Sequence, residues 1–354
     1  MNIIFFNTVA LGDYLVHSRL IRDLKAKYNC NITAVCSQYN SRIIKKHSHI
    51  DSVIIYDEKW SITKKYNCLK KILQKKYYLS IVFDCKKFSM ISNFLLNAEF
   101  KRGLLMRKYK KIFSFKINLY YPSKIIAKFL YDKYVIHKKV KYIDKHYYLP
   151  YTWIDLLSDF KLKTTKNNIY FFNPNKLLEK KKKELLKKIN VNKYILFHLD
   201  HKWEDILDIN NNFFSSLINL SKKINKNILI TSYNNNSNYF KNLEKKLNIF
   251  NTNNFTYLKR NNYNIFSIKN PDIFLQERLI SSSDINISCH SGILVHGSAS
   301  NNKIVVDILN SSEITLQKCW APFKNYFVVK KSFNKNKVKI GRIFNDLQKI
   351  IFKY

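Results

Sequence analysis

Short apolar runs alternate with amphipathic segments along the first part of the chain. Four runs have the length and composition of buried strands: 3–6, 31–37, 52–57 and 79–85. Apolar residues recur at helical spacing in the segments between them: 14–28, 41–47 and 65–78. This alternation is typical of parallel βαβ units. It predicts a doubly wound α/β domain that binds ligands at the carboxyl ends of its strands.

The same alternation returns in the second half. Strands are predicted in four places: 194–200, 227–233, 285–289 and 303–309. Helices are predicted in six: 179–189, 211–224, 238–247, 271–284, after 290, and 341–354. The basic, aromatic stretch 102–145 has no clear period, and we place helices there. The proline-containing stretch 146–160 marks the junction, so we expect domains at 1–155 and 156–335, followed by a terminal segment, 336–354.

The net charge of the chain indicates which classes of partner it would attract. Lys and Arg total 63 against 24 acidic residues, a formal charge of +39. Such a field attracts anions, including nucleic acids, anionic membranes and phosphorylated substrates. Compositional bias is the simpler origin of the excess. Lys, Asn, Ile, Tyr and Phe are abundant while Gly and Pro number 5 each, a pattern that AT-rich coding produces.

The six cysteines contain no C-x-x-C pair, which argues against a zinc ribbon or a thioredoxin site. The first apolar run has no basic segment before it, and Gly12 and Asp13 interrupt it, unlike a secretory signal. No apolar run reaches the 18 residues of a membrane span. We therefore expect a cytoplasmic protein with reduced thiols.

The stretch VALGDYLVH places Gly12 and Asp13 between the first strand and the first helix. Gly12 permits a turn that other residues disfavour. Asp13 falls near a helix N-terminus, where it can act as a cap. A carboxylate at the mouth of a doubly wound domain could also take a proton from an acceptor hydroxyl.

The stretch CHSGILVHGSAS places Ser291 and Gly292 at the start of a predicted helix, with His290 and His296 beside them. Backbone N–H groups at such a start bind phosphate oxygens, and Gly292 allows close approach. Either histidine could donate to a phosphate, while two histidines alone make a poor metal site. An ordinary βα turn with polar caps is the alternative.

The stretch FHLDHKWED crowds His198, Asp200, His201, Lys202 and Trp203 at the end of a predicted strand. Lys202 or His201 could meet a phosphate, and Trp203 could pack against the domain wall. The two histidines and the aspartate have the chemistry of metal ligands, but the flanking lysines would repel a cation. The chain has neither a P-loop nor a G-x-G-x-x-G fingerprint.

Together the three blocks resemble the family 9 glycosyltransferases, the heptosyltransferase group of lipopolysaccharide synthesis. That family has a Leu-Gly-Asp turn after the first strand, here VALGDYLVHSRLIRDL. It has a histidine-containing strand end before Lys and Trp, here LFHLDHKW. It also has an Asp-Ser/Thr-Gly turn with a His-x-Ala helix, here NISCHSGILVHGSAS, before KIVVDIL.

The resemblance implies a GT-B architecture, in which two Rossmann-like domains face a cleft and a C-terminal helix returns toward the first domain. It also implies metal-independent, inverting transfer from a nucleotide sugar, without a cofactor, to a glycan or lipopolysaccharide-type acceptor at the first domain. Asp13 matches the general base. The expected donor and phosphate site comprises these residues: Gly12, His198, Lys202, His290, Ser291, Gly292 and His296. The basic surface would favour peripheral association with an anionic membrane.

Three positions depart from the family pattern. His290 replaces the family's Asp, and His296 follows Gly292 by four residues rather than three. His201 stands two residues before Trp203, where the family has Lys. ADP-heptose and another nucleotide sugar therefore fit equally well. A basic nucleic-acid-binding protein and a GT-B-like protein without catalysis are the alternative functions.

Overall fold

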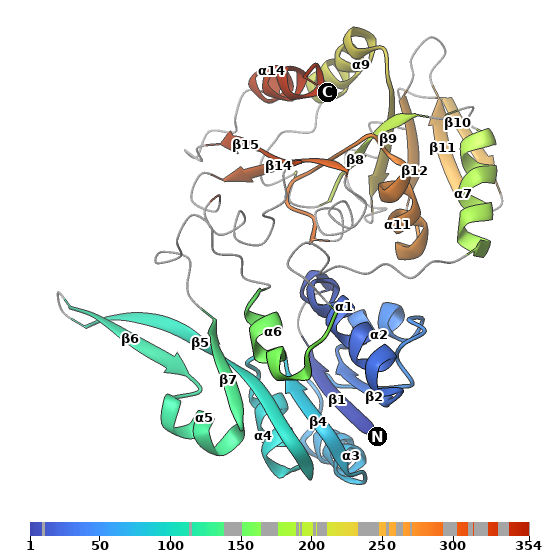
Figure 1. The fold of residues 1–354 in the computed structure, drawn as a ribbon. Helices are drawn as coiled ribbons and strands as arrows, with labels where there is room; N and C mark the ends of the chain where they lie inside the picture. Colours follow the sequence, from blue (N-terminus) through green and yellow to red (C-terminus); the bar gives the residue numbers. More distant parts are fainter. Residues whose placement is uncertain are drawn as a thin grey trace. The chain divides into compact units, whose positions relative to one another are not determined.

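The computed structural model folds into two compact units, residues 1–173 and 174–354 (Figure 1). It describes these residues: 1–8, 11–112, 115–137, 151–163, 176–188, 191, 193–200, 203, 211–232, 248–252, 255–259, 265–269, 271–292, 303–310, 314, 325–331 and 340–353. The helix predicted at 238–247, and most of the one predicted after 290, lie outside these residues.

A twisted sheet forms the centre of the first unit (Figure 1). Its path runs β3-β2-β1-β4-β5-β6, and β7 also pairs with β5. The bounds are β1 Asn2–Asn7, β2 Asn31–Cys36, β3 Ser52–Ile55, β4 Tyr77–Val82, β5 Ala98–Ile112, β6 Phe115–Tyr121 and β7 Lys133–His137. All pairings are parallel except that of β5 with β6. The central strands are buried on both faces because helices cover both sides.

Six α-helices belong to the described part of this unit: α1 Leu11–Tyr28, α2 Gln38–Ile44, α3 Ile62–Leu73, α4 Lys87–Leu95, α5 Lys124–Leu130 and α6 Tyr151–Leu156. Helices α3, α4 and α5 pack against Ile4 and Phe6 of β1 in one core. Phe5 points to the other face, where its ring contacts Tyr14 of α1. Serine caps begin three of these helices: α2 at Ser37, α3 at Ser61 and α5 at Ser123.

Within the described residues 102–112 and 115–137, the helices predicted across 102–145 are wrong except for α5. These described residues contain most of β5, all of β6 and β7, and the seven residues of α5 as helix. Strand pairing decides the outcome, because β5 is held between β4 and β7 by parallel ladders. A sequence without a helical period gives no competing preference.

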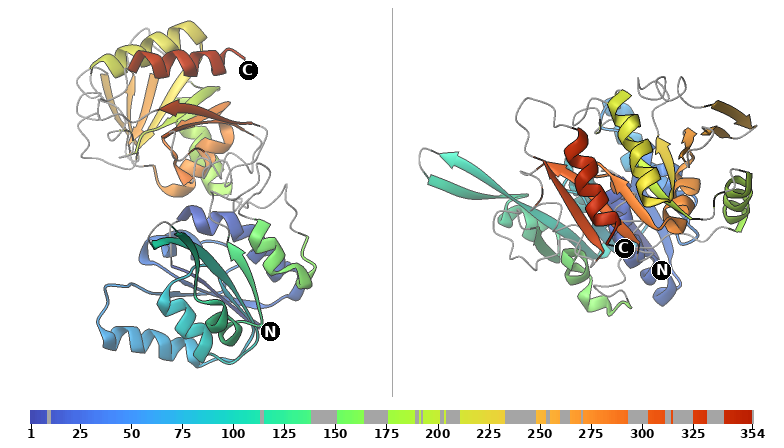
Figure 2. Two further views of the ribbon diagram at one scale, coloured as in Figure 1. Left: turned by 90° about the vertical axis from the view of Figure 1, so that its left-hand side faces the viewer. Right: turned by 90° about the horizontal axis from the view of Figure 1, so that it is seen from above.

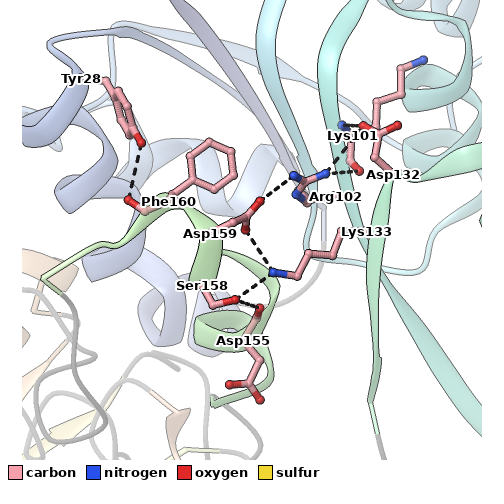
Figure 3. A network of polar contacts seen from close by, with 9 residues as sticks. All are labelled: Tyr28, Lys101, Arg102, Asp132, Lys133, Asp155, Ser158, Asp159 and Phe160. Atoms are coloured by element: carbon pink, nitrogen blue, oxygen red, sulfur yellow. Dashed lines mark hydrogen bonds and ion pairs between the residues drawn. The ribbon is translucent and has the colours of Figure 1, made fainter.

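Buried Arg102 ties the segment after residue 150 to the first unit (Figure 3). Its Nη2 lies 2.7 Å from Oδ2 of Asp159, and Nζ of Lys133 lies 3.1 Å from the other carboxylate oxygen. Phe160 packs its ring among Tyr28, Tyr78 and Phe100. The first unit therefore continues past residue 155, where the first domain was predicted to end.

Six parallel strands form the main sheet of the second unit, in the order β12-β9-β8-β13-β14-β15. Their bounds are β8 Tyr194–His198, β9 Asn227–Ser232, β12 Ile265–Lys269, β13 Ile285–Ser288, β14 Ile304–Asn310 and β15 Tyr326–Lys331. A separate hairpin joins β10 Asn248–Thr252 to β11 Phe255–Lys259. The described helices are α7 Lys176–Lys188, α9 Asn211–Ile224, α11 Ile273–Ser282 and α14 Ile340–Ile351.

The terminal helix α14 packs beside α9, as both views of Figure 2 show. Phe344 meets Phe213 with ring centroids 5.5 Å apart, and Leu347 lies in the same core. The return of this segment toward the first domain stays a prediction. Among the described helices, none combines the length and apolar composition needed to cross a membrane.

Both units use the same strand order. In the first unit, β1, β2 and β3 follow one another toward one edge of the sheet, and β4 lies on the other side of β1. In the second unit, β8, β9 and β12 do the same, and β13 lies on the other side of β8. The direction reverses between β1 and β4 in one unit and between β8 and β13 in the other. Such reversal points bind ligands at the carboxyl ends of the strands. The predicted doubly wound α/β class is confirmed in both halves.

Asp159→Asn should destabilise the chain by about 1–2 kcal/mol, because it removes the closest acidic partner of buried Arg102. Burial raises the pKa of Asp159, but hydrogen bonds and charge from Arg102 and Lys133 outweigh it and hold the pKa below its ordinary value. The effect should therefore be full at neutral pH and disappear as the pH falls through the carboxyl range. Denaturant unfolding measures it.

Asp155→Asn is the matched control, since it removes the same charge from the same segment at an exposed position. Equal losses in the two variants would contradict this assignment of the ion pair.

Candidate functional site

Asp84 fixes the exit of the chain from β1. It follows β4, is buried, and accepts hydrogen bonds from both the N–H and the hydroxyl of Thr8, at 2.7 and 2.8 Å. Its other oxygen accepts from the N–H of Lys86 at 3.2 Å. A buried carboxylate is stable when donors surround it in this way. The contact holds the ends of β1 and β4 together at the reversal point.

Gly12 and Asp13 lie in the first turn of α1, both half-buried. The prediction placed Asp13 at a helix N-terminus, and this is confirmed. The helix dipole favours a carboxylate at that position. Asp13 therefore stands within a few residues of the carboxyl end of β1, at the edge where open α/β sheets bind ligands.

His17 lies one helical turn beyond Asp13 and is fully buried. The side-chain amide of Asn7 donates to its Nε2 at 2.7 Å, and its ring stacks on Phe83 with centroids 3.9 Å apart. Burial lowers the pKa of His17 to about 3. The ring is therefore neutral at physiological pH and brings no charge close to Asp13.

Two more buried histidines, His47 and His49, contact Tyr14 of α1. The Tyr14 hydroxyl lies 2.7 Å from Nδ1 of His47 and 3.4 Å from Nε2 of His49. Burial lowers their pKa values to about 4 and about 3 respectively. Tyr14 of α1 thus contacts two uncharged imidazoles, and α1 itself contributes a third, His17.

In the second unit, the turn after β13 is held by Asp307 of β14. His290 adopts a left-handed backbone, with φ at 56°, a conformation that histidine reaches more often than most residues. Its N–H donates to Oδ1 of Asp307 at 2.6 Å, and its Nδ1 lies 2.8 Å from Oδ2. The N–H of Ser291 donates to the Ser288 hydroxyl at 3.2 Å. Gly292 follows, half-buried.

Tyr326 of β15 completes the environment of Asp307. Its hydroxyl donates to Oδ2 at 2.8 Å. Burial, reinforced by the Asp307 charge, raises the pKa of Tyr326 well above its ordinary value, so the phenol stays neutral and keeps donating. Asp307 is fully buried and accepts three hydrogen bonds. Because the imidazole gives Nδ1 to this carboxylate, its Nε2 faces the opposite direction.

His198 lies inside the end of the second sheet. Its side chain is buried, with Nδ1 3.1 Å from the Thr231 hydroxyl. The amide of Gln276 donates to the same hydroxyl at 3.0 Å. The indole of Trp203 donates to the backbone carbonyl of His198 at 2.8 Å. Trp203 is fully buried, as the prediction that it packs against the domain wall requires.

Three histidine and lysine positions of the sequence-based site lie outside the described residues: His201, Lys202 and His296. In the part of the chain that the structure describes, no three His, Cys, Asp or Glu side chains are grouped as metal ligands.

Sequence reasoning missed Asp84, Asp307 and Tyr326. The available signal was an aspartate inside or directly after an apolar run, since a buried carboxylate needs partners. Both aspartates meet residues of the candidate site across neighbouring strands. The structure thus brings His290, Ser291 and Gly292 together at one reversal point and places Gly12 and Asp13 at the other.

Neither a family model nor a curated protein sequence matches the chain. Solved structures do. A family 9 glycosyltransferase from Veillonella parvula DSM 2008 is similar with a TM-score of 0.67 and 11% identity, over 100% of this chain and 98% of the other. The ADP-heptose lps heptosyltransferase II of E. coli is similar with a TM-score of 0.65 and 11% identity, over 100% of this chain and 99% of the other.

A putative UDP-N-acetylglucosamine 2-epimerase from Listeria monocytogenes is similar with a TM-score of 0.56 and 9% identity, over 100% of this chain and 88% of the other. The chain therefore has the two-domain GT-B fold of the family 9 glycosyltransferases, as its motifs predicted. Because proteins named as transferases and as epimerases are both similar to this fold, the function has to be argued from the site.

The three buried histidines predict acid sensitivity. Their pKa values are lowered in the folded state, while an unfolded histidine titrates near 6.5. Stability should be flat above about pH 7 and fall as the pH drops from about 6.5 toward 4. Each histidine contributes about 1.4 kcal/mol per pH unit across that window.

Denaturant unfolding at a series of pH values measures this slope, and His17→Gln should make it shallower because one titrating group is gone. An unchanged slope in this variant would show that His17 does not contribute.

Proposed function

We propose that the chain is an inverting, metal-independent glycosyltransferase that uses a nucleotide sugar. The observation that carries the proposal is the turn at 290–292, where a carboxylate-held histidine stands at the reversal point of the second sheet. A leaving diphosphate needs positive charge and oriented donors. The GT-B fold supports the assignment of the donor to this sheet and of the acceptor to the first.

The hydrogen bonds within the turn indicate which groups would meet the diphosphate. The N–H groups of His290 and Ser291 are used internally, by Asp307 and by the Ser288 hydroxyl. We assign three contacts to the donor: Nε2 of His290, which faces away from Asp307, the Ser291 hydroxyl and the N–H of Gly292. An imidazolium donates from both ring nitrogens, so in that form His290 would bind Asp307 and a diphosphate oxygen together.

Asp13 is the general base of the proposal. The acceptor hydroxyl attacks C1 of the donor sugar and transfers its proton to the Asp13 carboxylate. The bond between C1 and the phosphate oxygen breaks, and the nucleoside diphosphate leaves with the electron pair. Attack opposite the leaving group inverts the configuration at C1. Gly12 permits close approach of the acceptor to the start of α1.

The donor class is a nucleoside diphosphate sugar. The names of the two similar enzymes from E. coli and Listeria monocytogenes specify such compounds, with different bases and sugars. ADP-heptose is one candidate, and a glycan or lipopolysaccharide-type molecule is the matching acceptor. Where the family has Asp, His290 offers a donor to phosphate or sugar oxygens, so the preferred sugar can differ from heptose.

A thermal-shift panel of nucleoside diphosphates and nucleotide sugars tests the donor class. One nucleotide should raise the melting temperature of the wild type and of Asp13→Asn equally, because Asp13 does not touch the donor phosphates. With the matching sugar donor, Asp13→Asn should lose transfer by about 100-fold or more. Asp155→Asn is the control that should keep both properties.

Stabilisation by no nucleotide would overturn the proposed function, and preferential stabilisation by single-stranded RNA would favour the nucleic-acid alternative. Normal transfer by Asp13→Asn would show that Asp13 is not the general base and would leave the donor assignment unaffected.

The role of His290 is tested by a double-mutant cycle on binding of the nucleoside diphosphate. His290→Gln should weaken it about tenfold, the effect of losing one charged hydrogen bond, and should leave the monophosphate nearly unchanged. Asp307→Asn should cost about as much, and the double variant should lose little more than either alone. Calorimetric titration measures all four proteins.

Tyr326→Phe is the control, since it removes one donor to Asp307 and keeps both bonds to His290. Additive losses in the double variant would show that Asp307 does not act through His290.

A further inference from the structure

Large apolar side chains are exposed on one part of the first unit. Nine of the fourteen such residues in the described chain belong to α3, α4 and α5: Ile62, Tyr66, Leu73, Ile91, Phe94, Leu95, Ile125, Ile126 and Phe129. Within the described residues of the second unit, Phe352 alone is of this kind. Single exposed apolar residues are ordinary, but a concentration on three neighbouring helices is not.

Helix α4 has its polarity reversed. Ile91, Phe94 and Leu95 are exposed at helical spacing on its outer side. Asn93 is buried on its inner side, where it accepts from the Ser80 hydroxyl at 2.5 Å and donates to the carbonyl of Leu130 at 2.9 Å. Burial of polar groups and exposure of apolar ones is the opposite of a solvated surface helix.

Helix α5 continues the pattern. Ile125 is 73% exposed and Phe129 is 74% exposed, one turn apart on the same side. Lys124 and Lys128, also one turn apart, are exposed beside them. Only small or partly covered residues of this helix reach the core, namely Ala127 and Leu130.

Helix α3 adds the third strip. Ile62 is 86% exposed and Tyr66 is 64% exposed. Helix α4 contacts both α3 and α5, and all three pack on the same face of the sheet (Figure 1). Together they carry seven lysines and no acidic residue: Lys64, Lys65, Lys70, Lys71, Lys87, Lys124 and Lys128. We call this surface the α3–α5 face.

We propose that the α3–α5 face docks on an anionic membrane surface. Interfacial binding needs apolar side chains that enter the boundary between headgroups and acyl chains, with lysines that meet anionic headgroups. Lysine stems can lie along the apolar area while their ammonium groups reach the phosphates. A protein partner would have to match the positive charge of all seven lysines. A nucleic acid could stack on the exposed rings of Tyr66, Phe94 and Phe129. The exposed aliphatic side chains of Ile62, Ile91 and Ile125 offer a base no ring and favour a lipid surface.

The inference extends the proposed function, because a lipid-anchored acceptor would lie at such a surface. It does not depend on the donor site, since vesicle binding and nucleotide binding are measured on the same protein in separate assays. A failure of vesicle binding would leave the donor assignment standing, and the reverse also holds.

Co-sedimentation of the full chain with vesicles is the test. Vesicles of phosphatidylcholine mixed with phosphatidylglycerol should bind it, and pure phosphatidylcholine vesicles should bind it far less. Lys124→Gln combined with Lys128→Gln should weaken binding roughly tenfold or more, and added salt should shrink this difference. Phe129→Ser should weaken binding at every salt concentration, because its contribution is apolar.

Matched controls lie in the second unit. Lys183→Gln with Lys187→Gln removes two exposed lysines one turn apart on α7, and Phe352→Ser removes an exposed phenylalanine. Both should bind vesicles as the wild type does, and all variants should keep their nucleotide response.

Four outcomes would overturn the proposal. They are absence of binding to the anionic vesicles, equal losses in the α7 control, tighter binding of the face to single-stranded RNA than to vesicles, and a dimer that Phe129→Ser converts to a monomer.

Discussion

The carboxylate of Asp307 is the contact on which the second half of the candidate site depends. It is fully buried, and it is satisfied by the N–H and the imidazole of His290 and by the hydroxyl of Tyr326. Removing the Asp307 carboxylate would leave the three donors that it binds without their acceptor. One group therefore sets both the left-handed backbone of His290 and the direction of its ring.

Asp84 has the corresponding role in the first unit, where it accepts hydrogen bonds from the N–H and the hydroxyl of Thr8 at the carboxyl end of β1. In both units, the carboxylate comes from or just beyond a strand next to the one whose exit it fixes. The chemistry that follows differs. The second unit presents an imidazole held by a carboxylate, while the first presents Asp13 one helical turn before the uncharged His17. In the proposed function, one half binds the leaving diphosphate and the other accepts the proton.

Local patterns in the sequence predicted much of the fold, including the bounds of α9 and the positions of Asp13 and His290. The failures involve contacts between distant segments. The described part of the stretch 102–145 is mostly strand because β4 and β7 pair with β5, and no local period in the sequence indicates this pairing. Asp307 was hidden for the same reason, since parallel pairing of β13 with β14 brings it to His290. His198 was predicted to meet phosphate, yet its ring is enclosed within the sheet end.

The central claim is that the second unit holds the diphosphate of a nucleotide sugar at the turn following β13. A crystal structure of the chain with the nucleoside diphosphate that stabilises it most would test this directly. The account predicts a β-phosphate oxygen within hydrogen-bonding distance of Nε2 of His290 and of the N–H of Gly292. A diphosphate bound in the first unit at the start of α1, with Nε2 of His290 making no contact to it, would contradict the account.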